Sequence, residues 1–332
     1  MVTELETRIR RRLDSLTKPP GSLGRLEEIA LQVGLIQGTD MPTVGRKAML
    51  LFCADHGVVA EGVSPFPQEV TRQMVANFRA GGAAITVLCR QYGIDPVIVD
   101  MGVGRPTRNF TREPAMSRAE AQRAVDMGLA HADDGDLLGA GEMGIGNSTA
   151  AAALLCAFTG TSPVEAAGRG TGLDDAGVTR KAEVIARALA LHPPDRNDAI
   201  GVLAAIGGFE IAAIVGLILG AAQKRRVVVL DGFISCSAAL VVCAMEPAAL
   251  DYVVYSHRSA ERGHRSMLES LNARPLLDLD MRLGEGSGAA IGISLVESAV
   301  RLYREMATFD GAGVSTSAET GRSGGSKSQP AS

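Results

Sequence analysis

The sequence of 332 residues has no tryptophan, only 4 tyrosines and 8 phenylalanines, and no excess of positive charge. Its 37 acidic residues outnumber its 33 basic ones, so that the formal net charge is −4. Proteins that bind nucleic acid usually need a concentrated positive field, and many of them stack bases on aromatic side chains. The composition therefore argues against a nucleic-acid-binding protein.

Disulfide and metal motifs are also missing. The five cysteines form no CxxC pair and all lie in apolar stretches: Cys53, Cys89, Cys156, Cys236 and Cys243. The five histidines show no metal-ligand spacing such as HExxH. Residues 1–14 are charged throughout and lack the apolar stretch of a signal peptide. We therefore expect a cytoplasmic protein with buried free thiols and no bound metal.

One long apolar segment, 199–222, contains a single charged residue, Glu210. Its length would allow a transmembrane helix, and a membrane-embedded protein is therefore the non-enzyme alternative. A small-xxx-small spacing between Gly216 and Gly220 fits that alternative. However, Gly207-Gly208 interrupts the segment and a charge falls at its centre. These features favour two buried helices that meet at the glycine pair, with no membrane association.

Short β-rich stretches alternate with helical patterns through most of the chain, which is typical of a parallel sheet covered by helices. Strands are expected at 48–54, 96–100, 136–139, 227–231 and 252–256. Helices are expected at 67–79, 175–191 and 288–307, the first with Val70, Met74 and Phe78 on one face. The first fifty residues differ, because two helical patterns there flank the glycine- and proline-containing stretch 17–24. The fold class is α/β.

Polar residues or glycines follow each expected strand, in the segments 55–57, 100–102, 139–142, 231–232 and 256–257. In open α/β sheets, ligands bind at the carboxyl ends of the strands. The pattern therefore predicts a composite site for small molecules. Acidic residues at strand ends can also cap helices, and this alternative stays open at each position.

Two glycine-rich segments could bind phosphate. Segment 139–144 (GAGEMG) fits the GxGxxG pattern, which makes an NAD(P)-dependent oxidoreductase the alternative enzyme class. The expected strand before it is short, and no second strand ends in an acidic residue at the expected distance. Segment 168–172 (GRGTG) precedes a helix that carries Lys181 and could supply backbone donors and a cation. It could equally be a plain loop beside a solvated lysine.

The segment 284–288 (GEGSG) places Glu285 between glycines, where no neighbouring side chain shields the carboxylate. A general base needs such access before a suitable proton affinity matters. A glutamate in the first turn of a glycine-rich helix start is the structural alternative.

Five segments in order carry a family resemblance: 16–27 (LTKPPGSLGRLE), 53–58 (CADHGV), 141–149 (GEMGIGNST), 230–233 (LDGF) and 281–290 (MRLGEGSGAA). Together they resemble the nicotinate-nucleotide–dimethylbenzimidazole phosphoribosyltransferases over residues 16–314. The resemblance implies a homodimer without metal or cofactor. Its large α/β domain, 46–287, is a Rossmann-like parallel sheet flanked by helices. A small helical domain combines residues 1–45 with the C-terminal helix 288–314. The composition beyond, rich in Ser, Gly and Thr, predicts a disordered tail at 315–332.

The activity implied by the resemblance belongs to cobalamin biosynthesis. The 5-phosphoribosyl group of nicotinate mononucleotide moves to 5,6-dimethylbenzimidazole with inversion at C1′, which yields α-ribazole 5′-phosphate and nicotinate. Nicotinate leaves without needing a proton, because its ring nitrogen is positively charged in the nucleotide. One carboxylate then suffices to remove the proton of the incoming base.

The resemblance also implies roles for individual residues. Glu285 is the catalytic base, and Glu142 lies near the ribose and base. The phosphate and ribose contacts fall on Gly144, Ile145, Gly170, Thr171, Lys181, Glu210, Asp231 and Ser256. The benzimidazole contacts fall on Pro65, Phe66, Met74 and Met143. Some relatives have glutamine in place of Met74, so the pocket here is more apolar and its preferred base stays open.

Overall fold

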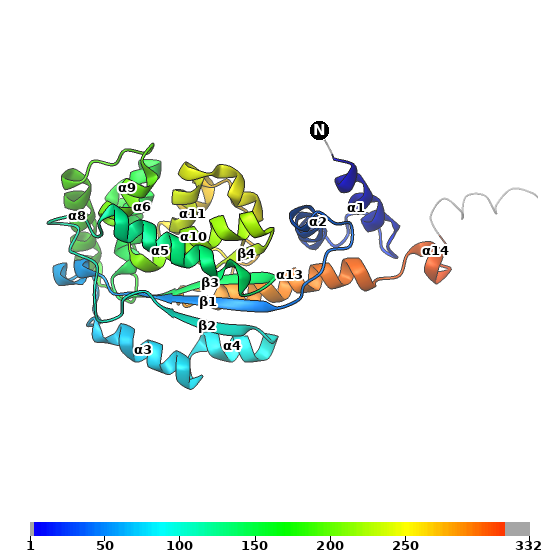
Figure 1. Cartoon of the computed structure of the whole chain (residues 1–332), viewed down its shortest axis with the longest axis horizontal. Coiled ribbons are helices and arrows are strands. Elements are labelled where there is room, and N and C mark those ends of the chain that lie inside the picture. Colours follow the sequence, from blue (N-terminus) through cyan, green and yellow to red (C-terminus); the bar gives the residue numbers. More distant parts are fainter. Residues whose placement is uncertain (1–2, 316–332) are drawn as a thin grey trace, which may run out of the picture. The chain divides into compact units, whose positions relative to one another are not determined.

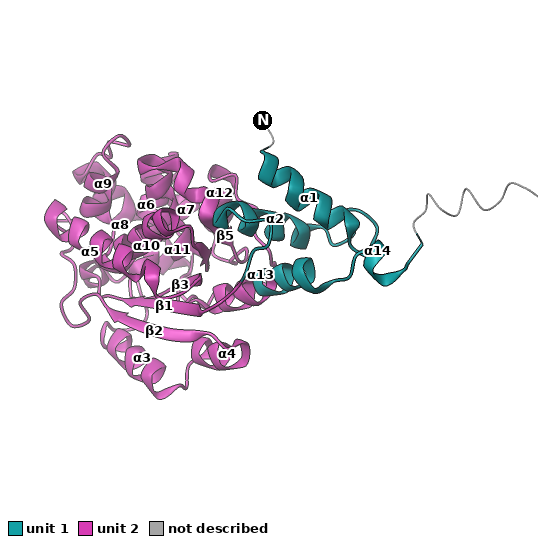
Figure 2. Ribbon diagram, turned by 45° about the vertical axis from the view of Figure 1, so that its right-hand side comes forward, with its two compact units in different colours: residues 1–43, 296–332 teal, residues 44–295 magenta. Residues whose placement is uncertain are grey.

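The computed structural model describes residues 3–315. These residues form two compact units, one of residues 3–43 and 296–315 and one of residues 44–295 (Figure 2). The domain limits expected from the sequence stay predictions, and the tail expected at 315–332 lies outside the described residues apart from Ser315.

The large unit contains one sheet of five parallel strands in the order β2-β1-β3-β4-β5. The strands are β1 (Lys47–Cys53), β2 (Asp95–Asp100), β3 (Leu137–Met143), β4 (Val227–Leu230) and β5 (Val253–Tyr255). The predicted α/β class with a parallel sheet is confirmed. Strand β2 pairs with one edge of β1, and the next strand in the chain, β3, pairs with the other edge of β1. The strand order therefore reverses between β1 and β3. Ligands bind beyond the strand ends near such a reversal.

Strand β3 is longer than the sequence predicts, because it continues through Gly139 and Gly141 to Met143. A Cβ atom on Gly139 would lie 2.4 Å from the Met49 side chain, and one on Gly141 would lie 2.6 Å from the Leu51 side chain. These glycines are thus packing positions inside a strand. The expected end of this strand at residue 139 is wrong.

Helices cover both faces of the sheet, with α3 (Glu69–Ala80) and α4 (Ala84–Tyr92) on the side opposite α5 (Arg118–Ala130), α6 (Asn147–Thr159) and α10 (Phe209–Lys224) in Figure 1. The other helices of this unit are α7 (Pro163–Ala166), α8 (Asp175–Leu191), α9 (Ala199–Ile206), α11 (Phe233–Met245), α12 (His264–Ser270) and the start of α13 (Ser287–Glu305), with 3₁₀ turns at Gly57–Glu61, His131–Asp133 and Pro247–Tyr252. Helix α3 starts two residues later than predicted and buries Thr71, Val75 and Phe78, so Met74 is only half-buried.

The apolar segment 199–222 forms α9 and α10, which meet at Gly207-Gly208 as the sequence predicts. Gly216 serves close helix packing, because a Cβ atom there would lie 1.8 Å from the carbonyl oxygen of Val125 on α5. Within residues 3–315, no helix has both the length and the apolar character needed to cross a bilayer.

The small unit consists of α1 (Glu4–Ser15), α2 (Arg25–Gln37), the C-terminal half of α13 and α14 (Phe309–Ala312). Tyr303 is buried here and donates its hydroxyl to the carbonyl of Asp40 at 2.6 Å. Inside the 16–27 segment, Lys18 and Glu27 form an ion pair at 2.9 Å that is largely shielded from water. This segment is therefore a structural element of the small unit.

Candidate active site

A pocket of the large unit lies at the carboxyl ends of β3, β4 and β5. The residues that line it are Val63, Ser64, Glu142, Met143, Gly144, Ile145, Gly146, Asn147, Ser148, Gly170, Thr171, Asp231, Gly232, Phe233, Ile234, His257, Ser259, Glu261, Arg282, Leu283, Gly284 and Glu285. Several strand ends thus contribute to one site, as the polar residues after the expected strands indicate.

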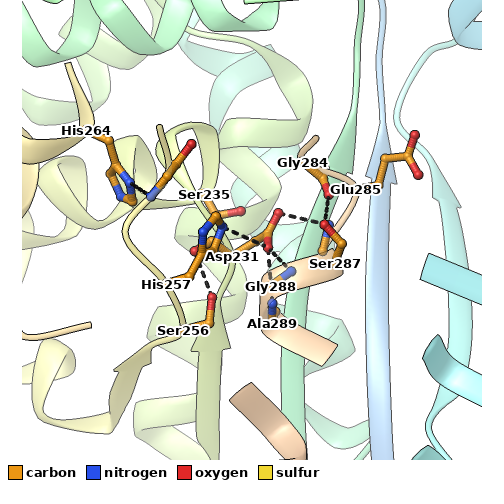
Figure 3. Close-up of polar contacts among 12 residues, drawn as sticks. Asp231, Ser235, Ser256, His257, His264, Gly284, Glu285, Ser287, Gly288 and Ala289 are labelled. Atoms are coloured by element: carbon orange, nitrogen blue, oxygen red, sulfur yellow. Dashed lines mark hydrogen bonds and ion pairs between the residues drawn. The ribbon is translucent and has the colours of Figure 1, made fainter. Parts of the chain in front are cut away.

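Glu285 lies on the pocket wall in an unusual backbone conformation. Its φ is +63°, and the flanking Gly284 and Gly286 have φ values of +81° and +82°. Glycine adopts this left-handed region freely, whereas a glutamate there costs on the order of 1–2 kcal/mol. The Ser287 hydroxyl donates to the Gly284 carbonyl at 2.8 Å and closes the turn. The Glu285 side chain points away from Asp231 in Figure 3.

Two carboxyl groups of the pocket have raised proton affinities. Burial and, second, the negative charge of Asp231 raise the pKa of Glu285 to about 7. Burial, Asp231 and Glu210 raise the pKa of Glu142 to about 8, although Asn147 donates a hydrogen bond to Glu142. The Glu285 amide also donates to Glu142 Oε1 at 3.4 Å. Such perturbed groups in a pocket are typical of acid–base chemistry.

The Asp231 carboxylate accepts backbone hydrogen bonds at the start of α13. Its Oδ2 accepts from the Gly286 amide at 3.0 Å, and its Oδ1 accepts from the amides of Gly288 and Ala289 at 2.7 and 3.1 Å. His257 Nε2 lies 3.6 Å from Oδ1. Asp231 is thus held by the protein itself, at a pocket position that the resemblance assigns to the nicotinate and ribose.

Another part of the pocket is lined by residues that the sequence predicts to bind phosphate. Gly170 and Thr171 line it, and so does Ser148 at the start of α6. Lys181 lies behind them and donates to Ser148 Oγ at 2.8 Å and to the Gly168 carbonyl at 3.4 Å. Burial lowers the pKa of Lys181 to about 8, against the opposing charge of Glu261.

Three other predicted phosphate or ribose residues are already paired inside the protein. The buried Glu210 contacts His56 Nε2 at 2.6 Å through its Oε1. Ser256 donates its hydroxyl to the Asp231 carbonyl at 2.9 Å. The amide of Ile145, which lines the pocket beside Gly144, donates to Thr71 Oγ1 at 3.1 Å. Their predicted roles remain untested, but the structure places Glu210 and Ser256 behind the pocket wall.

Of the residues expected to bind the aromatic base, only Met143 lines the pocket. Pro65 and Phe66 are exposed and Met74 is half-buried, and none of the three lines the pocket. Their contact with a base stays a prediction. The apolar lining consists instead of Val63, Met143, Ile145, Phe233, Ile234 and Leu283.

Several pocket residues were not identified from the sequence, namely Asn147, Ser148, Glu261 and Arg282. Asn147 and Ser148 follow the GEMGIG segment directly, so their place at a helix start could have been read from the sequence. The position of Glu261 gave no local signal. Among residues 3–315, no group of three or more His, Cys, Asp or Glu side chains is arranged to hold a metal ion.

Comparison with known proteins adds independent information. A family model described as "Phosphoribosyltransferase" matches residues 1–314. The nicotinate-nucleotide–dimethylbenzimidazole phosphoribosyltransferase of Chloroflexus aggregans is 49% identical over 333 residues, and the match covers 94% of each chain. The protein of the same name from Cupriavidus necator is 51% identical over 324 residues, which cover 92% of this chain and 93% of that protein.

Solved structures agree with these sequence matches. The crystal structure of CobT from Thermus thermophilus is similar with a TM-score of 0.90 at 45% identity, over 94% of this chain and 99% of that one. A second Thermus thermophilus structure, of nicotinate-nucleotide–dimethylbenzimidazole phosphoribosyltransferase, has a TM-score of 0.88 at 43% identity, over 95% of this chain and 100% of that one. The similarity therefore extends over nearly the whole chain in both sequence and fold.

Proposed function

The chain belongs to the nicotinate-nucleotide–dimethylbenzimidazole phosphoribosyltransferase family, and on this premise we propose that it moves the 5-phosphoribosyl group of nicotinate mononucleotide to 5,6-dimethylbenzimidazole, with Glu285 as the proton acceptor. The observation that carries the proposal is the Glu285 carboxyl, which lines a pocket at the strand ends with its pKa raised to about 7. A base with such a pKa can take up and release a proton near neutral pH.

The reaction breaks the bond between C1′ and the pyridinium nitrogen, and the electron pair of that bond neutralises the nicotinate ring. No acid is needed for this step. One nitrogen of the benzimidazole attacks C1′ from the opposite face and forms the α linkage. The proton on its other nitrogen then passes to Glu285, while the buried Glu142 orients the ribose.

The other end of the pocket suits a phosphate. Ser148 lies in the first turn of α6, where backbone N–H groups and the helix dipole attract an anion. Gly170 and Thr171 complete the wall, and the Lys181 ammonium group behind them supplies a charge. Holding both substrates in one cleft can contribute roughly 7–11 kcal/mol of the rate acceleration through proximity and orientation.

We further propose a homodimer that works in the cytoplasm. The family resemblance supports the dimer. The cysteines support a reducing compartment, because all five are free thiols and four of them are buried.

An oxidoreductase would rest on the GxGxxG match alone. In dinucleotide-binding proteins the glycines of that pattern form the turn between a strand and a helix. Here Gly139 and Gly141 lie inside β3 and pack against side chains of β1. The match thus lacks its structural context, and the comparisons favour phosphoribosyl transfer.

The test is direct product analysis. The protein is incubated with nicotinate mononucleotide and a panel of benzimidazoles, purines and phenols, and the products are identified by mass spectrometry and NMR. We expect α-ribazole 5′-phosphate and one nicotinate for each product molecule. Turnover of NAD(P) with a hydride acceptor, and no ribosylated base, would contradict the proposal.

A further inference from the structure

The loop that carries Glu285 needs an anchor. Three consecutive residues, 284–286, adopt left-handed φ values, and the central one is not glycine. Such a conformation persists only where the surroundings determine it. The Glu285 carboxyl itself accepts none of the hydrogen bonds that stabilise the turn, since these involve backbone groups of the loop. The anchor must therefore come from outside the loop.

Figure 3 shows Asp231 beside this loop, with hydrogen bonds to the start of α13. Asp231 follows β4, and its carboxylate is 1% exposed. It accepts three amide hydrogen bonds, from Gly286, Gly288 and Ala289, the first of which belongs to the residue directly after Glu285. Charge-assisted bonds of this kind are about twice as strong as neutral ones.

The sequence of α13 fits this contact. A Cβ atom on Gly288 would lie 2.8 Å from Asp231 Oδ1 and 2.1 Å from the His257 ring. Glycine is therefore required at 288 if the carboxylate is to reach the backbone. An ordinary N-cap residue directly precedes its helix, whereas Asp231 is separated from Gly288 by 57 residues and comes from a core strand. The loop is thereby tied to the rigid sheet.

We propose that Asp231 is a positioning residue for the reaction: through three backbone amides it holds the loop that presents Glu285 to the pocket, and its charge acts on the Glu285 carboxyl. The inference rests on the proposed function. It gives Asp231 a role through the protein backbone, which differs from direct contact with the ribose or nicotinate.

Electrostatics distinguish this role from a purely structural one. Asp231 is the second cause, after burial, of the raised pKa of Glu285 and of Glu142. The charged and titratable groups around these carboxyls are Cys53 on β1, Glu210 on α10, Cys236 on α11, His257 and Glu261 after β5, His264 on α12 and Arg282 before Glu285. Burial and then His257 lower the pKa of His264 to about 3, so His264 stays neutral and does not offset the charge of Asp231.

The experiment measures kcat and KM against pH for the full chain and for Asp231→Asn. An amide can face the three N–H groups with only one oxygen, so at least one amide loses its acceptor. We expect kcat to fall about 10- to 100-fold, as a misplacement of about 1 Å can cause. KM for nicotinate mononucleotide should change less than about threefold. Because a negative charge is removed, Glu285 should lose its proton more readily, and the acid limb of the kcat profile should move to lower pH.

Asp55→Asn is the matched control. Asp55 is also buried, follows the neighbouring strand β1 and accepts from the Gly104 amide at 2.6 Å, but it does not line the pocket. Asp55→Asn should leave the acid limb of the kcat profile at the parental pH. Asp231→Glu keeps the charge and displaces the carboxylate, so it should lower kcat with little movement of the limb. If Asp231→Asn fails to fold, Gly288→Ala tests the same amides and should likewise lower kcat more than it raises KM.

The outcomes separate the two proposals. If the parent makes no ribosylated base, or if Glu285→Gln stays active, the proposed function fails. If both behave as expected but Asp231→Asn keeps its kcat and the position of its acid limb, only the positioning role is wrong. A large rise in KM with kcat unchanged would also overturn it, because that pattern indicates direct substrate binding by Asp231.

Discussion

Two groups of residues at the pocket, the acidic end (Glu142 and Glu285) and the proposed phosphate end (Ser148, Gly170, Thr171 and the underlying Lys181), respond to burial in opposite ways. At the acidic end, burial raises the pKa of Glu285 to about 7 and of Glu142 to about 8. At the phosphate end, burial lowers the pKa of Lys181 to about 8. Because loss of hydration disfavours the charged form of each group, it raises the pKa of the acids and lowers the pKa of the lysine, and all three pKa values approach neutral pH. The shift suits the proposed proton transfer, whereas at the proposed phosphate site it weakens the charge of the ammonium group.

The backbone differs between the two ends as well. Glu285 lies in a left-handed turn anchored by Asp231, while Ser148 and Lys181 lie on the regular helices α6 and α8. Acid–base chemistry depends on the placement of one carboxyl group within a few tenths of an ångström, and phosphate binding is shared among several donors. We therefore expect single substitutions to be most severe at the acidic end.

The largest effect is predicted for Glu285→Gln. Glutamine keeps the size of the side chain but cannot accept the proton, and loss of a general base typically costs about 10²–10⁴ in rate. We expect kcat to fall by this factor while affinity for the mononucleotide persists, as measured by initial rates and by calorimetry. Glu142→Gln should cost less.

A melting curve provides the control for Glu285→Gln, since a fold-preserving variant should melt within a few degrees of the parent. If more than about a tenth of the parental kcat remains, Glu285 is not the base. Substitutions at the acidic end would then not be more severe than those at the phosphate end, and Glu142 would become the leading candidate for the general base.

The phosphate end should respond through KM. In Lys181→Met an apolar side chain of similar length replaces the buried ammonium group, and a charged hydrogen bond is worth about 1.5–3 kcal/mol. We expect KM for nicotinate mononucleotide to rise roughly 10- to 150-fold with a smaller change in kcat. Arg180→Met, at the exposed neighbouring position, is the control and should leave KM nearly unchanged.

The parental pH dependence sharpens this prediction. Because the pKa of Lys181 is lowered to about 8, its charge is present below that pH and is lost as the pH rises through it. KM of the parent should therefore rise above about pH 8, and KM of Lys181→Met should not. An unchanged KM in Lys181→Met would place the phosphate elsewhere.

A smaller effect concerns stability. The folded-state pKa of Glu142, about 8, exceeds its ordinary value of 4.5, so the folded protein keeps a proton that the unfolded chain releases between these pH values. Glu142 thus destabilises the fold increasingly as pH rises from about 5 to 8. Glu142→Gln should remove this dependence, so that its stabilising effect is larger at pH 8 than at pH 5. Denaturant unfolding at both pH values measures it, and an equal effect at both would contradict the raised pKa.

Much of the large unit could be predicted from the sequence, because strand and helix patterns alternate and Gly207-Gly208 interrupts an apolar run. The extent of β3 could not, since Gly139 and Gly141 resemble a turn signal and only the neighbouring Met49 and Leu51 side chains explain them. Tertiary packing outweighed the local signal there.

Contacts between residues far apart in the chain could not be predicted from the sequence either. Glu210 and His56 are 154 residues apart and meet only through the fold. Asp231 could be predicted at a strand end, but its hydrogen bonds to the start of α13 depend on how β4 and α13 pack. Residue type and spacing indicated that a site exists. The separate roles of the residues inside it could be assigned only from their three-dimensional contacts.

The smallest predicted effect concerns the aromatic base and distinguishes two methionines. Met143 lines the pocket, whereas Met74 on α3 is half-buried and outside it. Each methyl group of dimethylbenzimidazole that is buried contributes up to about 0.8 kcal/mol, or about fourfold in kcat/KM. The parent should therefore prefer the dimethylated base to unsubstituted benzimidazole. Met143→Ala should reduce this preference, because it removes apolar surface beside the base, and Met74→Ala should leave it within about twofold. The reverse order would place the base against α3 and the segment before it, where Met74, Pro65 and Phe66 were expected to bind it.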